Sequence, residues 1–389
     1  MTSPFPAGFL WGAATSPHQT EGGNVSSDWW ALEHAGNALV RQRSGDAVDS
    51  YHRWPEDMDL LAEAGFTDYR FGVEWARIEP VRGEFSQAAI DHYTRMVDGA
   101  LTRGLRPLLT LHHFTSPEWF AERGGWVAAD APELFERYVG ELTPLLASAL
   151  PRVCTINEPN LLAVMPRVLS GEARLEPGLP LPDESVVEAL LDAHARARKV
   201  LKNVNPGIDV GWSVACQAFQ PEPGAEQACA QHALPRETRF LTAARDDDWV
   251  GVQSYTRHRV GLQSEAPVVL PMPADAERTL NGWEVYPQAL GQAVREAAEA
   301  SGVPVIVTEN GIATDDDAQR IAYTDAALAS LAAAVADGVD VRGYFHWSLL
   351  DNFEWGRWEP TFGLVAVDRT TFRRTPKPSL TWLGARAPR

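Results

Sequence analysis

The stretch VPVIVTEN, residues 303–310, is typical of a β-strand that is buried on both faces. It is a nearly continuous apolar run rich in β-branched residues, as buried parallel strands are, and it closes on Glu309 and an asparagine. Seven further β-rich runs occur along the chain: Gly8–Ser16, Asp68–Trp75, Arg106–Phe114, Arg152–Pro159, Ile208–Ala215, Asp248–Tyr255 and Val341–Ser348. The eight runs together predict a large parallel sheet.

Amphipathic stretches at helical spacing separate these runs, and several end at a glycine suited to a helix C-cap. The clearest are Pro55–Gly65, Gln87–Gly104, Pro132–Leu146, Glu184–Leu201 and Tyr323–Gly338. Repeated strand–helix alternation predicts an α/β fold, a (β/α)8 TIM barrel. No Ser/Gly-rich linker or charge block divides the chain, so we expect residues 1–389 to form a single catalytic barrel domain. Glu176–Pro182 and Pro221–Pro273 are expected to be surface loops around the sixth strand.

The composition argues against several classes of partner. The formal net charge is −18, and an acidic surface repels phosphate backbones, so we expect no nucleic acid partner. No stretch is long enough to cross a membrane, and no basic residue precedes the short apolar run at the N-terminus, so we expect neither a membrane partner nor secretion. The three cysteines, Cys154, Cys216 and Cys229, form no disulfide framework, which favours a cytoplasmic location.

Two glutamates follow predicted strands at positions where chemistry is expected. Glu158 closes the fourth run and Glu309 closes the seventh. The carboxyl ends of all barrel strands open on one face, which holds the active site. Two facing carboxyl groups suit glycosidic bond cleavage, since one must be protonated to release the leaving group and the other ionised to attack or stabilise the anomeric carbon. A single glutamate at the end of a strand is usually a loop residue or the neighbour of a helix N-cap, so neither residue alone indicates this chemistry.

Four motifs, in order along the chain, resemble those of glycoside hydrolase family 1, the β-glucosidase type. They are FLWGAATSPHQTEG at 9–22, TINEP at 155–159, VTENG at 307–311 and WSLLDNFEW at 347–355. The resemblance covers nearly the whole chain. It implies a retaining β-glycosidase, in the first instance a β-glucosidase, that hydrolyses terminal non-reducing β-D-glycosyl residues by double displacement. The implied substrate is a β-glycoside, either an oligosaccharide or an aryl or alkyl glycoside.

The resemblance also implies a role for individual residues. Glu158 matches the acid/base and Glu309 the nucleophile, while Arg70 and Tyr255 match residues that contact the nucleophile. The residues implied to bind the sugar are Gln19, His113, Asn157, Trp347, Glu354 and Trp355. A guanidinium and a phenol beside Glu309 should hold it ionised, and that charge should raise the pKa of Glu158. In a retaining enzyme the two carboxyl groups are expected roughly 5–5.5 Å apart.

The chain departs from the family pattern at several positions. Residues 253–255 are QSY where the family usually has Asn-Tyr-Tyr, Phe114 replaces a tryptophan, and Thr361 replaces an arginine in an interval that is one residue short. The chain is also shorter than typical members. Trimmed loops would open the leaving-group side to bulky aglycones, and Trp283 is expected to line that side.

Other functions are compatible with parts of this pattern. The adjacent His112 and His113 should point to opposite faces of a strand, and no metal-ligand spacing exists, so we expect no metal or other cofactor and place only His113 in the pocket. Arg70 could also pair structurally with Glu74.

The same site could serve a β-galactosidase, β-fucosidase, β-mannosidase or transglycosylase. A catalytically inactive sugar-binding barrel would not need both glutamates, and a metal-dependent hydrolase would need ligands. The preferred sugar and the oligomeric state stay open.

Overall fold

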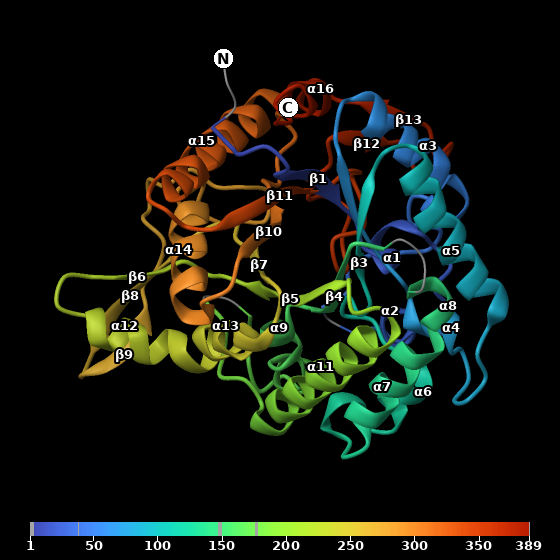
Figure 1. Cartoon of the computed structure of the whole chain (residues 1–389). Helices are drawn as coiled ribbons and strands as arrows, with labels where there is room; N and C mark the ends of the chain where they lie inside the picture. Colours follow the sequence, from blue (N-terminus) through green and yellow to red (C-terminus); the bar gives the residue numbers. More distant parts are fainter. Residues whose placement is uncertain (1–3, 38, 147–149, 176–177, 389) are drawn as a thin grey trace.

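The computed structural model describes residues 4–37, 39–146, 150–175 and 178–388. Eight parallel strands close into a barrel in the order β1-β11-β10-β7-β5-β4-β3-β2, and helices surround it (Figure 1). The barrel strands are β1 (Leu10–Ala14), β2 (Asp68–Gly72), β3 (Arg106–Thr110), β4 (Arg152–Asn157), β5 (Asp209–Ala215), β7 (Val250–Gln253), β10 (Val305–Asn310) and β11 (Val341–Trp347). The predicted (β/α)8 fold is confirmed.

Each barrel strand lies within its predicted run, and most end before the run does. The run Asp68–Trp75 stops pairing at Gly72, because Trp75 already begins the short helix α4 (Trp75–Ile78). At the ends of two other runs the backbone turns left-handed, with φ of 67° at Phe114 and 46° at Glu158. Such residues cannot continue a strand, so the polar ends of the runs become the loops of the barrel mouth.

The long helices alternate with the strands and cover the outside of the barrel (Figure 1). They are α3 (Ser50–Glu63), α5 (Gln87–Thr102), α7 (Ala131–Glu141), α11 (Glu184–Val204), α14 (Ala289–Ser301) and α15 (Asp317–Ala336). The predicted helix Pro132–Leu146 is divided, since α7 ends at Glu141 and α8 covers Thr143–Leu146. Pro144 lies at this break; it lacks the N–H that a continuous helix would use.

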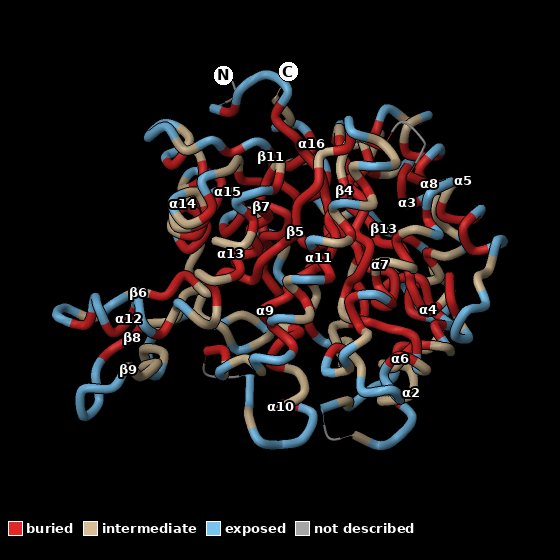
Figure 2. Tube along the Cα trace, turned by 60° about the horizontal axis from the view of Figure 1, so that its bottom comes forward, coloured by how far each residue is buried: buried red, intermediate tan, exposed pale blue. Residues whose placement is uncertain are grey.

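The shorter helices lie mainly in the connections. They are α1 (Pro17–Thr20), α2 (Asp28–His34), α6 (Glu118–Glu122), α9 (Pro159–Leu162), α10 (Met165–Leu169), α12 (Glu226–Ala233), α13 (Arg239–Ala243) and α16 (Pro378–Gly384), with single turns of 3-10 or π-helix at Gly125–Val127, Leu234–Thr238 and Ala244–Asp246. A two-stranded sheet of β12 (Val365–Val367) and β13 (Arg374–Pro376) follows the barrel. Figure 2 shows the buried residues concentrated in the strands and the inner faces of the helices. Within the described ranges, no helix combines the length and apolarity needed to span a bilayer.

The segment Pro221–Pro273 is more ordered than the sequence predicted. Besides α12, α13 and the barrel strand β7, it contains β8 (His258–Gln263) and β9 (Ala266–Val269), which form a projecting sheet with β6 (Phe219–Pro221) (Figures 1 and 2). The prediction of a surface loop was wrong here. The turn between β8 and β9 is Ser264-Glu265, with φ of 50° and 66°, and it lacks the glycine or asparagine that usually marks such a hairpin.

The second predicted loop, Glu176–Pro182, falls partly outside the described residues, since 176 and 177 are not described. Its remaining residues, 178–182, form neither helix nor strand.

Candidate active site

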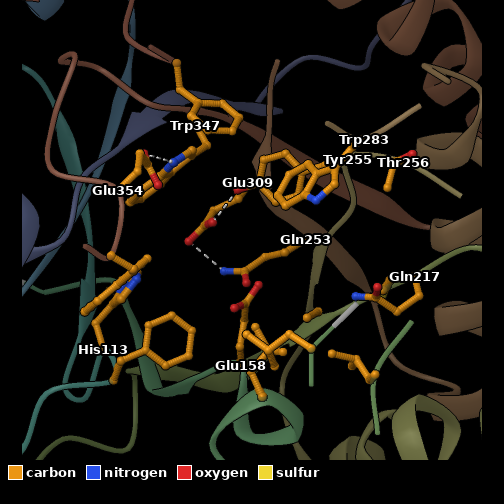
Figure 3. Close-up of a pocket in the computed structure, with 18 of the residues that line it drawn as sticks. His113, Glu158, Gln217, Gln253, Tyr255, Thr256, Trp283, Glu309, Trp347 and Glu354 are labelled. Atoms are coloured by element: carbon orange, nitrogen blue, oxygen red, sulfur yellow. Dashed lines mark hydrogen bonds between the residues drawn. The ribbon is translucent and has the colours of Figure 1, made fainter. Parts of the chain in front are cut away.

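A cavity of about 250 Å³ opens where the barrel strands end (Figure 3). Eight of the ten site residues predicted from sequence line it: Gln19, His113, Glu158, Tyr255, Glu309, Trp347, Glu354 and Trp355. The other two, Arg70 and Asn157, are fully buried in β2 and β4 and reach the lining residues from behind. Barrel closure therefore brings together residues from both ends of the chain.

Three donors hold the carboxyl group of Glu309, the penultimate residue of β10. The Arg70 Nη1 donates to Oε1 at 2.5 Å, and the Tyr255 hydroxyl donates to Oε2 at 2.6 Å. Gln253, which lies opposite Glu309 in the β7–β10 register, donates its Nε2 to Oε1 at 2.8 Å (Figure 3). Both oxygens are thus positioned, and hydrogen bonds to a carboxylate favour its ionised form.

Arg70 is directed at the centre of the barrel mouth. Its Nη2 donates to the Asn157 Oδ1 at 2.5 Å, and its Nε to the Thr110 hydroxyl at 3.2 Å. The alternative pairing with Glu74 is wrong, because the Glu74 carboxyl accepts instead from the Thr115 hydroxyl at 2.7 Å. Arg70 is therefore a buried cation that contacts Glu309 and Asn157 of the candidate site.

Glu158 faces the same cavity in a different environment. It occupies the N-cap position of α9 with a left-handed backbone, and its N–H donates to the Ser213 carbonyl at 2.7 Å. Glu158 is only 7% exposed, and among the described residues no group donates a hydrogen bond to its carboxyl group. Burial, and next the charge of Glu309, raise the pKa of Glu158 well above its ordinary value.

The two carboxyl groups therefore do not titrate alike. Burial raises the pKa of Glu309 as well, but the charge of Arg70 and the hydrogen bond from Tyr255 oppose that rise. As expected, Arg70 and Tyr255 favour the ionised form of Glu309. Burial outweighs them, however, and the pKa of Glu309 stays above its ordinary value. Glu158 lacks such donors, so the hydrogen bonds and the charge of Arg70 favour ionisation at Glu309 rather than at Glu158.

A third carboxyl group lies on the opposite wall of the cavity. The Trp347 Nε1 donates to the Glu354 Oε1 at 3.2 Å, and the Gln19 Nε2 donates to Oε2 at 3.3 Å. Burial raises the pKa of Glu354 to about 8. The Ser16 hydroxyl donates to the Gln19 Oε1 at 2.7 Å, which sets the orientation of that amide. This group of acceptors and donors is suited to hydroxyl groups of a sugar.

Aromatic rings enclose the space between these carboxyl groups. His113 is nearly parallel to Trp347 and Trp355, with ring centroids 5.9 and 6.2 Å away. Burial and the charge of Arg70 lower the pKa of His113 well below its usual value, so the ring is neutral. His112 does not line the cavity and contacts the Ser116 hydroxyl at 3.0 Å, on the other side of the strand end.

Gln253 is the residue that sequence reasoning did not assign. Besides Glu309, its Nε2 contacts the Asn157 Oδ1 at 2.7 Å. The Asn157 Nδ2 and the Gln253 Oε1 are buried and have no hydrogen-bond partner in the described part of the chain. The Asn157 side-chain oxygen thus accepts two hydrogen bonds, while its amide donors are unpaired among the described residues. The sequence could have indicated this role through strand pairing, because Gln253 ends β7 and lies opposite Glu309 in the β7–β10 register.

Most of the remaining residues that line the cavity are apolar. These remaining residues are Trp283, which the sequence predicted to line the cavity, and Phe114, Leu161, Leu175, Leu179, Ala215, Cys216, Gln217, Thr256, His258 and Phe362. Among the described side chains, no group of three or more His, Cys, Asp or Glu is arranged to hold a metal ion.

A barrel whose mouth holds two buried carboxyl groups of unequal pKa has the site of a glycosidase. The profile of glycosyl hydrolase family 1 matches residues 1–244 and 248–387. The chain belongs to this family and is a glycoside hydrolase.

Individual relatives agree with this membership. Beta-glucosidase A of Thermotoga maritima is 30% identical, over 97% of this chain and 96% of the relative. A bifunctional beta-D-glucosidase/beta-D-fucosidase of Bifidobacterium breve is 29% identical, over 98% of each chain. Among solved structures, the beta-glycosidase BGL167 superposes with a TM-score of 0.89 at 44% identity, over 98% of this chain and 96% of the other.

Proposed function

We propose that the protein is a retaining β-glucosidase that hydrolyses terminal non-reducing β-D-glucosyl residues by double displacement, as a single catalytic domain. The observation that carries this proposal is the unequal environment of the two buried carboxyl groups. Glu309 accepts hydrogen bonds from Arg70, Tyr255 and Gln253. The pKa of Glu158, by contrast, is raised by burial and by the charge of Glu309. An ionised nucleophile and a protonated acid are the two states that the first step requires.

In the first step, a carboxylate oxygen of Glu309 attacks the anomeric carbon from the face opposite the aglycone. The bond from that carbon to the glycosidic oxygen breaks, and this oxygen takes the proton of Glu158. We assign to the Asn157 Nδ2, which has no hydrogen-bond partner among the described residues, a hydrogen bond to the hydroxyl beside the reacting carbon, where such bonds strengthen in the transition state. The product of this step is a glycosyl ester of Glu309 and a free aglycone.

In the second step, Glu158, now ionised, takes a proton from water. The water oxygen bonds to the anomeric carbon, and the ester bond to Glu309 breaks. Glu158 regains its proton and Glu309 its negative charge, so the enzyme returns to its starting state. Two inversions at one carbon give net retention.

The preference for glucose rests on the names of the relatives, among them Beta-glucosidase A of Thermotoga maritima. Retention of both catalytic carboxyl groups disfavours an inactive sugar-binding barrel. We also propose a cytoplasmic location without nucleic acid or membrane partners, in keeping with three buried free cysteines and a net charge of −18.

The stereochemistry of the first product tests the mechanism. Proton NMR of an aryl β-glucoside digest should show the β-anomer of glucose first, with the α-anomer appearing later by mutarotation. An initial α-anomer would exclude double displacement. A parallel panel of aryl glycosides that differ only in the sugar should give the highest kcat/KM for the glucoside; a higher value for the galactoside, fucoside or mannoside would reassign the specificity.

A further inference from the structure

A second cavity adjoins the leaving-group side of the candidate active site. Its volume is about 300 Å³, and it shares Thr256, His258 and Trp283 with the first cavity. Its other walls come from the start of β8 and from the two segments 270–272 and 278–284. A leaving group that passes Trp283 would therefore enter this second cavity.

Three arginines line the second cavity, and two of them are already engaged. Arg257 makes a bidentate ion pair with Glu284, with N–O distances of 2.7 and 3.1 Å, and its guanidinium lies 3.9 Å from the centre of the Tyr286 ring. Arg259 pairs with Glu222 at 3.1 Å. These contacts hold two cationic groups in place.

The third arginine, Arg278, is differently placed. It lines the cavity and is exposed, and within the described ranges neither a hydrogen bond nor an ion pair of its side chain is found. The neighbouring His258 adds no charge at neutral pH, since burial lowers its pKa to about 4. Arg257 and Arg259 are each paired with one carboxylate, and Arg278 is paired with none among the described residues. The arginines and their partners therefore carry one excess positive charge, on a chain whose net charge is −18.

The remaining walls are apolar. Leu270, Pro271 and Met272 form one side, and Trp283 forms the border with the active site. An apolar body could pack between these side chains while a terminal anion reached Arg278. Such a division between a hydrophobic surface and one charged group is typical of sites for small amphiphilic ligands.

We propose that this cavity, which we call the arginine cavity, binds the aglycone of anionic β-glycosides, with an aromatic or apolar body against Trp283 and a carboxylate at Arg278. The proposal rests on the proposed function, because it assigns a substrate class to the same enzyme. Arginine is suited to this role, since its planar guanidinium pairs with both oxygens of a carboxylate.

Two matched substrates test the proposal: the β-glucosides of 3-(4-hydroxyphenyl)propanoate and of its primary amide. The charge is insulated from the phenol by the alkyl chain, so the two leaving groups are chemically similar. Wild-type kcat/KM should favour the carboxylate by roughly three- to tenfold at low salt, the scale of one partly exposed charge-assisted contact. The preference should shrink as salt is added.

Variants of Arg278 separate this contact from general effects. Arg278→Gln should reduce the carboxylate-to-amide ratio to about one, and Arg278→Glu should invert it, because the charge that faces the aglycone changes sign. The control is Arg342→Gln, because Arg342 lies near the start of β11, at the opposite end of the barrel, and is also exposed. A wild-type ratio of one or less, or a ratio unaffected by Arg278→Gln, would overturn the proposal. Failure of the enzyme to hydrolyse both of these glucosides and also a nitrophenyl β-glucoside would instead refute the proposed function.

Discussion

At the scale of single residues, the division of labour between Glu158 and Glu309 follows from their hydrogen-bond partners. Glu309 accepts hydrogen bonds from three donors, one of them a fully buried arginine. Glu158 is buried beside the negative charge of Glu309, and both effects raise its pKa. The sequence could predict Arg70 and Tyr255 by resemblance. It could not predict the contacts of Gln253, since they depend on how far one side chain reaches across two strands.

Removing Glu158 should affect substrates according to how much their leaving group needs a proton. In Glu158→Ala, cleavage of alkyl glucosides and disaccharides should fall by several orders of magnitude, whereas glycosylation by nitrophenyl glucosides should be largely spared. The glycosyl-enzyme should then accumulate, and azide should restore turnover and yield a β-glycosyl azide.

The pH profile of the Glu158→Ala variant provides a further measurement. The pKa of Glu158 is raised, so its proton, and with it activity, is lost as pH rises; this basic limb should disappear in the variant.

A uniform loss across all substrates, with no azide rescue and a persistent basic limb, would contradict the acid/base assignment. It would indicate that Glu158 only shapes the start of α9, whose N-cap position it occupies.

Gln253 should act as a positioning residue for the nucleophile. Gln253→Leu removes the donor to Glu309 and to Asn157 while keeping a similar volume, and kcat/KM should fall by about ten- to a hundredfold, the usual value of a hydrogen bond to a charged group. Loss of that donor raises the pKa of Glu309. The acidic limb, where Glu309 becomes protonated as pH falls, should therefore move to higher pH. An acidic limb that stays in place despite lower activity would mean that Gln253 acts only by packing. Gln253→Glu, which keeps the length of the side chain but loses the amide donor, should lower activity in the same way.

At the scale of elements, apolar runs and helical spacing predicted all eight barrel strands and five of the surrounding helices. Strand ends were predicted less well. The run Asp68–Trp75 reads as one strand, yet its last residues turn out of the sheet to build the mouth. The β8–β9 hairpin was missed because Ser264-Glu265 adopts a left-handed turn that tertiary contacts, rather than local preference, must support.

Helix packing depends on a glycine in α14. A Cβ at Gly291 would overlap the Ser330 main chain and hydroxyl on α15, so Gly291→Ala should lower the free energy of unfolding by roughly 1–3 kcal/mol, as overpacking does. The matched control is Gly140→Ala in α7, where the added Cβ has no described heavy atom within 4 Å apart from the local backbone of the helix itself. That change should raise stability by about 0.5–1 kcal/mol, because alanine loses less entropy in a helix. Urea unfolding followed by circular dichroism measures both, and equal shifts for the two variants would contradict this account.

At the scale of the whole molecule, closure of the barrel creates the active site. Glu158 and Glu309 lie far apart in the sequence, but β4 and β10 are separated in the ring only by β5 and β7. The sequence predicted this arrangement once eight strands were recognised, because the carboxyl ends of barrel strands share one face. It did not predict the arginine cavity, which depends on the projecting sheet and on the segment 278–284.

The central claim is that Glu309 forms a covalent bond to the sugar. The most direct measurement is peptide mapping by mass spectrometry after inactivation with a 2-deoxy-2-fluoro-β-glucosyl fluoride, whose fluorine slows the second step and traps the intermediate. We predict one 2-fluoroglucosyl group per chain on the peptide containing VTENG, at Glu309, and no labelling or turnover in Glu309→Ala. A label on Glu158, Glu354 or any other residue, or unchanged labelling in Glu309→Ala, would contradict the account.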